Sequence, residues 1–191
     1  MDIKALAQKY EPYIIERRRY FHAHPELSFK EWGTTKALVA EFEKMGMEIQ
    51  TFPDYPGLIA TLDTGKPGRT VMLRADIDAL PVKEGTGLDF ASQNEGVMHA
   101  CGHDNHMAML LGAAHILLEK KDELKGKVKF LLQSGEEMAC GAKYYVDHHI
   151  LDGVDAIFGQ HIWGTLDAPY VCVASGNRMA SCDNFTIRVK G

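Results

Sequence analysis

The sequence predicts an α/β fold in which a mainly parallel β-sheet is flanked by helices on both faces. Short apolar runs that suit buried strands alternate along the chain with longer segments of helical periodicity. The run at 70–74, TVMLR, is nearly continuous in apolar residues, as strands covered on both faces are. Polar clusters follow several of these runs, as expected where a ligand site forms at the carboxyl ends of parallel strands.

The individual elements follow from periodicity and from residues that break or cap helices. Residues 3–20 place apolar side chains on one broad helical face, and Pro25 disfavours helix at the residue before it. Asp104 suits the N-cap of a helix that opens at Asn105. The expected helices cover 3–20, 34–45, 104–119 and 142–149, and the expected strands cover 57–63, 70–74, 127–133 and 156–162.

The pattern changes near Tyr170, where the alternation of strands and helices stops. Residues 184–190, NFTIRVK, alternate strictly between apolar and polar side chains, as a half-exposed antiparallel strand does. We therefore expect two domains, the first over residues 1–175 and the start of a second over residues 176–191.

Composition and charge argue against several classes of protein. The 191 residues carry a formal net charge of -5 and no Lys/Arg tract, so we expect no nucleic-acid partner. The longest apolar run, 107–118, is shorter than the roughly 20 residues that cross a bilayer. The N-terminus lacks the apolar core of a secretory signal, and four scattered cysteines suit reduced thiols, so we expect a cytoplasmic protein without a membrane partner.

The stretch HACGHDNH, residues 99–106, concentrates metal-binding side chain types that core packing does not require. Thiolate and imidazole are good ligands for Zn²⁺ and related ions, and Gly102 lets the backbone turn so that Cys101 and His103 face one point. The alternative is a buried free cysteine beside a capped helix. His99 and His106 are weaker candidates, which suit packed or supporting positions better than metal ligation.

Three further groups follow predicted strands. Glu136 and Glu137 are adjacent and point in different directions, so one suits a metal and the other suits proton transfer from water. The alternative for this pair is an exposed acidic loop. His161 is either a ligand or a packed side chain. Asp76 and Asp78 share one face if their strand continues, and they either orient ligating histidines or belong to a turn.

Five stretches together resemble the N-terminal part of the M20 metallopeptidase family, in particular its amidohydrolase branch. They are FHAHPELSFKE, LRADIDALPV, MHACGHDNHMAMLLGAA, LLQSGEEMACGA and GQHIW. They occur in the order typical of the family, within residues 18–163. This chain has SGEE where members often have PAEE, a difference that flanks the two glutamates without removing them. The branch includes N-acyl-amino-acid amidohydrolases and hippurate hydrolases.

The resemblance implies a zinc-peptidase-like catalytic domain that holds two divalent metal ions, either Zn²⁺, Mn²⁺, Co²⁺ or Ni²⁺. It implies that Cys101 bridges the metals and that His103, Glu137 and His161 are further ligands. Glu136 is then the general base, and later the general acid, in hydrolysis of the amide bond of an N-acyl amino acid or short peptide.

Full-length family members are considerably longer and contain a lid domain. The resemblance therefore implies that residues 176–191 begin this lid, that the longer protein forms homodimers through it, and that the 191-residue chain alone is inactive. One alternative is a non-catalytic metal-binding or regulatory fragment of such a protein. A second alternative is a redox-responsive protein in which Cys101 is a reactive thiol.

Overall fold

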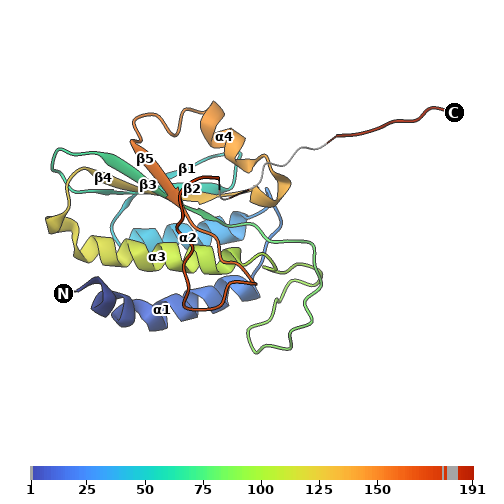
Figure 1. Cartoon of the computed structure of the whole chain (residues 1–191), viewed down its shortest axis with the longest axis horizontal. Helices are drawn as coiled ribbons and strands as arrows, with labels where there is room; N and C mark the ends of the chain where they lie inside the picture. Colours follow the sequence, from blue (N-terminus) through green and yellow to red (C-terminus); the bar gives the residue numbers. More distant parts are fainter. Residues whose placement is uncertain (1, 178, 180–184) are drawn as a thin grey trace.

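The computed structural model describes residues 2–177, 179 and 185–191, and these contain a five-stranded sheet (Figure 1). Its strand order is β1-β2-β4-β3-β5. The strands are β1 (Glu48–Thr51), β2 (Gly57–Asp63), β3 (Thr70–Asp76), β4 (Lys127–Gln133) and β5 (Ala156–Gly159). The four α-helices of the described residues lie on both sides of the sheet, with the first three along the chain on one side and the last on the other (Figure 1). In that order they are α1 (Ile3–Ala23), α2 (Trp32–Lys44), α3 (His103–Glu119) and α4 (Gly141–Asp147).

The sheet is mixed, which corrects the prediction of a mainly parallel sheet. β3, β4 and β5 run parallel to one another, whereas β1 pairs antiparallel with β2 and β2 pairs antiparallel with β4. Strand β2 is at least as buried as the parallel strands β3 and β4, so its sequence contains no signal for its direction. The edge strand β1 was not predicted, because its sequence, EIQT, is short and mostly exposed.

Two apolar layers hold the helices against the sheet. On one face, Phe42 of α2 packs against Phe130 of β4, and Leu111 of α3 joins the same buried cluster. On the other face, Tyr145 of α4 packs with Met72 of β3. Each fully buried side chain of this size contributes roughly 1.5–3 kcal/mol to folding. The predicted covering of both faces is therefore present, with most helices on one side.

Helix α3 begins one residue earlier than predicted, and this changes the role of Asp104. Gly102 is the N-cap residue, with a left-handed φ of 87° that favours glycine. Asp104 lies inside the first turn, fully buried, and its carboxylate accepts a hydrogen bond from His22 Nδ1 at 2.8 Å. The prediction that Asp104 caps this helix is therefore wrong, because its carboxylate contacts His22 and Arg18 of α1 instead.

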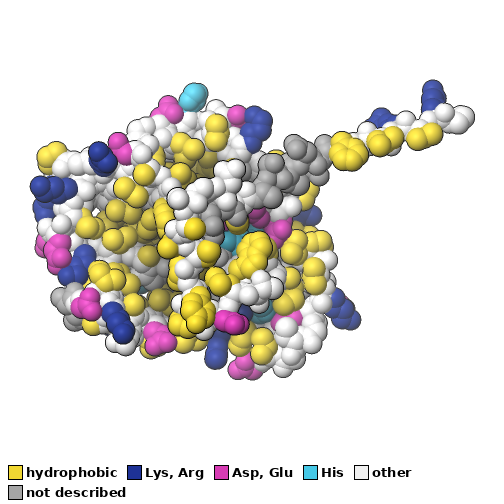
Figure 2. All heavy atoms as spheres, in the orientation of Figure 1, with side chains coloured by type: hydrophobic (Ala, Val, Ile, Leu, Met, Phe, Trp, Pro, Cys, Tyr) yellow, Lys and Arg dark blue, Asp and Glu magenta, His cyan; other side chains and the backbone are white. Residues whose placement is uncertain are grey.

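The chain is irregular after β5, which ends at Gly159 rather than at the predicted residue 162. Of the predicted strand at 184–190, Asn184 lies outside the described residues, and residues 185–190 adopt no strand. They form an extended tail with exposed hydrophobic side chains (Figures 1 and 2). The first strand of a lid domain is thus not confirmed.

Two short 3₁₀ helices are also present among the described residues. The 3₁₀ helices η1 (Lys121–Glu123) and η2 (Glu136–Met138) follow α3 and β4. Cys101 and Cys140 form no disulfide within the described part of the chain, and Cys182 lies outside it. Among the described helices, none combines the length and the apolar character that crossing a membrane requires.

Candidate metal centre

The polar groups singled out in the sequence lie together at one edge of the sheet. Because β3, β4 and β5 are parallel, their carboxyl ends meet there. β3 ends at Asp76, β4 leads into the pair Glu136 and Glu137, and the segment after β5 carries His161. The loop that precedes α3 brings Cys101 to the same edge.

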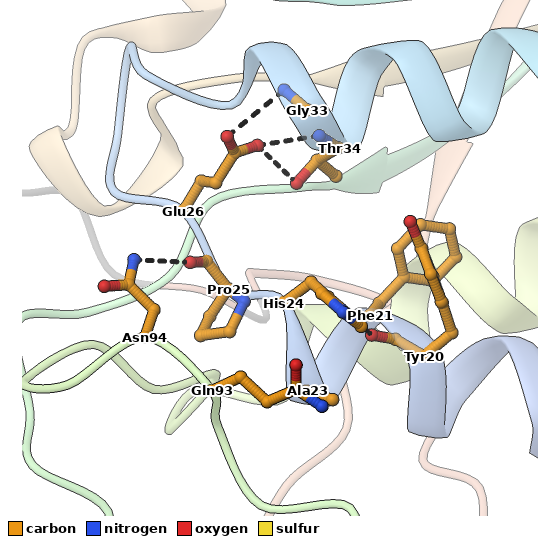
Figure 3. Close-up of a pocket in the computed structure, with 10 residues that line it drawn as sticks. All are labelled: Tyr20, Phe21, Ala23, His24, Pro25, Glu26, Gly33, Thr34, Gln93 and Asn94. Atoms are coloured by element: carbon orange, nitrogen blue, oxygen red, sulfur yellow. Dashed lines mark hydrogen bonds between the residues drawn. The ribbon is translucent and has the colours of Figure 1, made fainter.

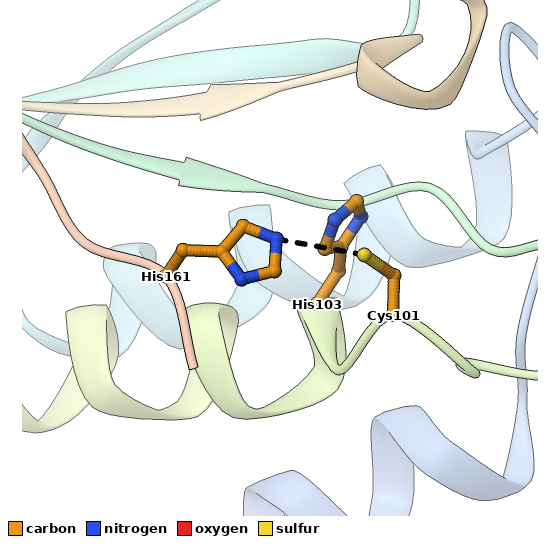
Figure 4. Close-up of side chains that lie close together, drawn as sticks. All are labelled: Cys101, His103 and His161. Carbon is orange, nitrogen blue, oxygen red and sulfur yellow. Dashed lines mark hydrogen bonds between the residues drawn. The ribbon is translucent and has the colours of Figure 1, made fainter. Parts of the chain in front are cut away.

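Cys101, His103 and His161 point toward one another (Figure 4). The Sγ atom of Cys101 lies 3.5 Å from Nε2 of His161, and one ligand atom from each of the three residues lies within 4.8 Å of the others. Nδ1 of His161 contacts the backbone oxygen of Ile162, which suits a proton on Nδ1 and leaves the Nε2 lone pair facing the sulfur.

Asp78 sets the orientation of His103. Nδ1 of His103 lies 2.9 Å from the backbone oxygen of Asp78 and 3.2 Å from its Oδ1, so it donates to this residue. Nε2 is then the atom with a free lone pair, and it faces Glu136 and Glu137 at 3.8 Å from one carboxylate oxygen of each. The predicted supporting role of Asp78 for a ligating histidine matches this arrangement.

Glu136 and Glu137 differ in their surroundings. The single turn η2 places both after β4, and the backbone N–H of Glu137 donates to Asp78 Oδ2 at 2.9 Å. The side chain of Glu137 is 18% exposed and that of Glu136 is 38% exposed, so Glu136 is the more open of the two. Burial, together with the nearby Asp76, raises the pKa of Glu136.

His106 lies beside these residues, and among the described residues its Nε2 has a hydrogen-bond partner whereas its buried Nδ1 has none. Its Nε2 accepts a hydrogen bond from the backbone N–H of Ile162 at 3.2 Å, and its Nδ1 lies 3.3 Å from Asp76 Oδ2. The ring packs against that of His161, with centroids 4.5 Å apart. Asp76, His103 and His106 form a second group with ligand atoms within 4.8 Å. The supporting position predicted for His106 stays a prediction, because this residue itself belongs to a possible metal-binding group.

Residues 72–181, more than half of the chain, match the family described as Peptidase family M20/M25/M40. The chain belongs to this family. The resemblance inferred from the sequence motifs is thereby confirmed. The chain is 41% identical, over its whole length, to an N-acyl-L-amino acid amidohydrolase of Geobacillus stearothermophilus, of which it covers 52%. It is 45% identical over 93% of its length to an N-acetylcysteine deacetylase of Bacillus subtilis, of which it covers 47%.

Solved structures of the M20 family share the fold. A putative aminohydrolase of methicillin-resistant Staphylococcus aureus is 48% identical with a TM-score of 0.81, over 85% of this chain and 44% of that one. A Bacillus subtilis protein described as a dinuclear metal binding peptidase of the M20 family is 44% identical with a TM-score of 0.78, over 85% of this chain and 45% of that one. The M20 chain thus spans about half the length of the curated relatives it matches.

The protonation of the Cys101 thiol depends on whether a divalent metal ion is bound beside it. Burial and the neighbouring Glu137 raise the pKa of the Cys101 thiol to about 12. Reactive cysteines have a lowered pKa, so the M20 chain does not show the microenvironment that the redox-thiol alternative requires. A divalent metal reverses the situation, because a thiol that coordinates a metal is deprotonated.

The residues of this edge fit divalent metal ions. A thiol, imidazoles and carboxylates form the donor set that Zn²⁺ and related ions bind. Within the described residues, Nε2 of His103 and Oε1 of Glu137 are buried without a hydrogen-bond partner. Such unsatisfied groups cost about 1–3 kcal/mol or more each unless another group binds there. Negative charge is concentrated at the same place by Asp76, Asp78 and Glu136.

Two further buried histidines, His99 and His22, lie apart from these groups. His99 is buried, and neither ring nitrogen has a hydrogen-bond partner among the described residues. Burial lowers the pKa of His99 to about 4, so this side chain is neutral. His22 bridges Asp104 and Glu84, at 2.8 and 3.1 Å. Neither histidine belongs to a possible metal-binding group within the described part of the chain.

A cavity of about 410 Å³ lies at the end of α1 and contains none of the predicted site residues (Figure 3). Glu26 lies on its wall and accepts hydrogen bonds from the backbone N–H groups of Gly33 and Thr34. Glu26 therefore satisfies the first turn of α2, and the cavity is separate from the candidate metal centre.

Sequence reasoning missed two residues that contact this centre from the N-terminal segment. Ser28 donates to Asp78 Oδ2 at 2.7 Å, and Glu31 accepts hydrogen bonds from the turn that precedes Glu136. Both lie within FHAHPELSFKE, but spacing within that stretch does not indicate a contact across about a hundred residues of sequence.

Proposed function

We propose that this M20 chain carries the metal centre and the general base of an amidohydrolase that cleaves the amide bond of N-acyl amino acids. The observation that carries the proposal is the convergence of Cys101, His103 and His161 beside Glu136 and Glu137. The names of the relatives from Geobacillus and Bacillus support a small N-acyl amino acid as the substrate class.

In this proposal two divalent ions, either Zn²⁺, Mn²⁺, Co²⁺ or Ni²⁺, would be held by Cys101, His103, Glu137 and His161, and the Cys101 thiolate would be a ligand common to both. The buried, unpartnered atoms of His103 and Glu137 support their assignment as ligands. When bound, such ions polarise the amide carbonyl and lower the pKa of water. Asp78 keeps the Nε2 lone pair of His103 available by accepting the proton of Nδ1.

Glu136 moves the proton in the proposed reaction. Its carboxylate takes a proton from water as the water oxygen bonds to the acyl carbon, and it returns the proton to nitrogen as the C–N bond breaks. The products are a carboxylate and a free amino acid. The greater exposure of Glu136 and its raised pKa support this role, since an efficient proton shuttle has a pKa near the working pH.

We extend the proposal to the organisation of the longer protein. Residues 1–175 form the N-terminal part of the catalytic domain, and residues 176–191 begin a lid domain through which homodimers form. The protein works in the cytoplasm without a nucleic-acid or membrane partner. The greater length of the relatives supports a longer protein, and the net charge of -5 supports the lack of a nucleic-acid partner.

Hydrolysis assays test the proposed activity in two forms of the protein. One form is the 191-residue chain, and the other is the chain extended by the part of the Geobacillus relative that follows the matched region. Both are supplied with Mn²⁺, Co²⁺ or Zn²⁺ and with N-acetyl- and N-benzoyl-amino acids. We expect release of free amino acid by the extended form and none by the chain alone.

The outcomes separate the proposal from its alternative. An extended form that is folded and binds metal but releases no amino acid contradicts the amidohydrolase proposal and supports a metal-binding or regulatory role. Turnover by the 191-residue chain at the rate of the extended form contradicts only the expectation that the chain alone is inactive. A chelator such as EDTA should abolish turnover in either form.

A further inference from the structure

A buried carboxyl group from a distant segment holds the turn that precedes the two glutamates. Glu31 is 0% exposed. Ser134 Oγ lies 2.8 Å and 2.7 Å from the two carboxyl oxygens of Glu31, and the backbone N–H of Gly135 donates to Oε1 at 3.1 Å. Glu31 thus contacts the two residues that lead directly into Glu136.

The same turn is packed tightly on its remaining sides. The backbone N–H of Ser134 donates to the hydroxyl of Tyr145 at 3.3 Å, and the N–H of Gly141 donates to the oxygen of Gly135 at 3.1 Å. A Cβ atom on Gly141 would lie 2.0 Å from the oxygen of Ser134, so the backbones are in direct contact. A shift of the turn therefore cannot occur without movement of α4.

The segment that carries Glu31 contacts the turn at a second point. The Phe29 ring covers Gly135, where an added Cβ would lie 2.2 Å from Cε1 of the ring. Phe29 and Gly135 both have left-handed backbone conformations, with φ of 63° and 71°. For a bulky residue such as Phe29 this conformation costs energy, and it persists where surrounding contacts determine it. Residues 28–31 are therefore held in a fixed shape against the turn.

Capping of α2 does not explain the burial of Glu31. It occupies the N-cap position of α2, yet its side chain makes no capping hydrogen bond there. Glu26 binds the free N–H groups of that first turn instead (Figure 3). Burying a carboxyl group is costly unless it forms hydrogen bonds, and those of Glu31 go to Ser134 and Gly135.

We propose that Glu31 is a positioning residue for the candidate metal centre: its carboxyl group fixes the turn at Ser134 and Gly135 and thereby directs Glu136 and Glu137 toward His103. This inference rests on the proposed metal centre. Metal ligands and reacting groups must be held within a fraction of an ångström of their working geometry, so a loosened turn weakens both roles of the pair. Position 31 therefore requires a side chain with the hydrogen-bonding geometry of the carboxyl group, and does not require its negative charge.

Substitutions of Glu31 test this proposal in the 191-residue chain, with Co²⁺ as the probe. Glu31→Gln retains an acceptor for Gly135 and a group that bonds Ser134, whereas Glu31→Asp is too short to reach and Glu31→Ala removes both bonds. Glu41→Ala is the matched control, because Glu41 is also buried and lies in α2, but it bonds Tyr13, Arg17 and Lys44. The measurements are Co²⁺ affinity, the Co²⁺ absorption spectrum and metal-free amide exchange over residues 133–138.

We expect Glu31→Asp and Glu31→Ala to weaken Co²⁺ binding about 10–100-fold, as loss of a group that orients a metal ligand typically does. Their amide exchange at residues 133–138 should be faster than that of the unmodified chain. Glu31→Gln should bind Co²⁺ with the original spectrum and affinity, which a general loss of stability would not produce. Glu41→Ala should lower stability and leave Co²⁺ binding unchanged.

Two results overturn the inference while leaving the metal centre in place. One is unchanged Co²⁺ affinity and amide exchange in folded Glu31→Asp and Glu31→Ala. The other is an equal loss of affinity in Glu41→Ala, which would attribute the effect to stability alone. Absence of Co²⁺ binding by the unmodified chain is a different result, because it contradicts the proposed metal centre and with it the role of Glu31.

Discussion

At the scale of single residues, Asp78 connects three separate segments of the chain. It accepts hydrogen bonds from Ser28 Oγ at 2.7 Å and from the N–H of Glu137 at 2.9 Å, and its Oδ1 lies 3.2 Å from His103 Nδ1. Burial opposes ionisation of Asp78, but the hydrogen bonds from His103, Glu137 and Ser28 lower its pKa. An ionised Asp78 therefore fixes a histidine and a glutamate of the candidate metal centre together.

Substitution of the two adjacent glutamates should have different consequences. Glu136→Gln should retain metal and lose about 10²–10⁴-fold in kcat of the extended protein, since general-base catalysis contributes this much. Glu137→Gln should lose metal, because Glu137 is assigned as a ligand. Metal content after dialysis and kcat for an N-acetyl-amino acid measure the two effects. Exchanged phenotypes would reverse the assignment of base and ligand.

Glu31 should make the stability of the protein fall as the pH rises. Burial raises the pKa of Glu31 from 4.5 to about 7. Because the folded-state pKa lies above the unfolded value, the stability from this group is fully present below about pH 4.5 and is lost as the pH rises through about 7. Glu31→Gln lacks this titration, so the free energy of unfolding of the unmodified chain should fall by roughly 3 kcal/mol relative to the variant.

Urea denaturation between about pH 5 and about pH 8 measures this difference. A constant difference between the two proteins over that range would show that Glu31 does not titrate there. A protonated Glu31 also accounts for the two contacts of its carboxyl oxygens with Ser134 Oγ. The single hydroxyl proton of Ser134 is donated to one carboxyl oxygen, and the protonated carboxyl oxygen donates to Ser134 Oγ.

At the scale of elements, the start of α3 and the segment after β5 depend on each other. Gly102, with φ of 87°, leaves room for the side chain of Ile162. The N–H of Ile162 donates to His106, and the neighbouring residue is His161. The close approach at Gly102 therefore sets where the segment after β5 crosses the helix, and with it the position of a proposed ligand.

Gly102→Ala should lower both stability and metal affinity. The added Cβ would lie 2.3 Å from Cδ1 of Ile162, so the side chain of Ile162 must move, and we expect this to displace the neighbouring His161. The left-handed backbone conformation costs roughly a further 1–2 kcal/mol once residue 102 carries a Cβ. Gly46→Ala is the control, because its φ is also positive, at 69°, and nothing lies within 4 Å of the added atom.

Urea denaturation and Co²⁺ titration distinguish these two variants. Both should be less stable than the unmodified chain, and only Gly102→Ala should bind Co²⁺ more weakly. Equal Co²⁺ affinity in the two variants would show that the contact between Gly102 and Ile162 does not position His161.

At the scale of the whole molecule, β5 leaves one edge of the sheet open among the described residues. It pairs with β3 on one side, and Ile157 and Phe158 are 50% and 61% exposed. Hydrophobic side chains are visible across this face of the molecule (Figure 2). An open strand edge with exposed apolar side chains favours pairing with another strand.

We therefore expect the 191-residue chain to self-associate as its concentration rises, and Phe158→Lys to reduce this association. A charge on an edge strand opposes pairing with a second chain. Light scattering coupled to size-exclusion chromatography measures the average mass across concentrations. Val146→Lys is the control, since Val146 is similarly exposed, at 58%, but lies on α4. An equal effect of the two substitutions would exclude a specific role of the β5 edge.

The sequence by itself determined the family, most helices and strands, and the residue types of the candidate metal centre. These follow from local signals: apolar periodicity for α1 and β4, and the motifs around Cys101, Glu136 and His161. Such signals depend on neighbours along the chain, which is why they are readable without a structure. Ligand roles and the domain division stay proposals.

Only the tertiary structure decided how distant segments meet. The antiparallel direction of β2 depends on which strands flank it. Asp104 contacts His22, which lies 82 positions away, and Arg18, which is also on α1. The contact of Glu31 with Ser134 spans 103 positions. Buried carboxylates find their hydrogen-bond partners through the fold rather than through spacing in the sequence, because burial is a property of the packed chain.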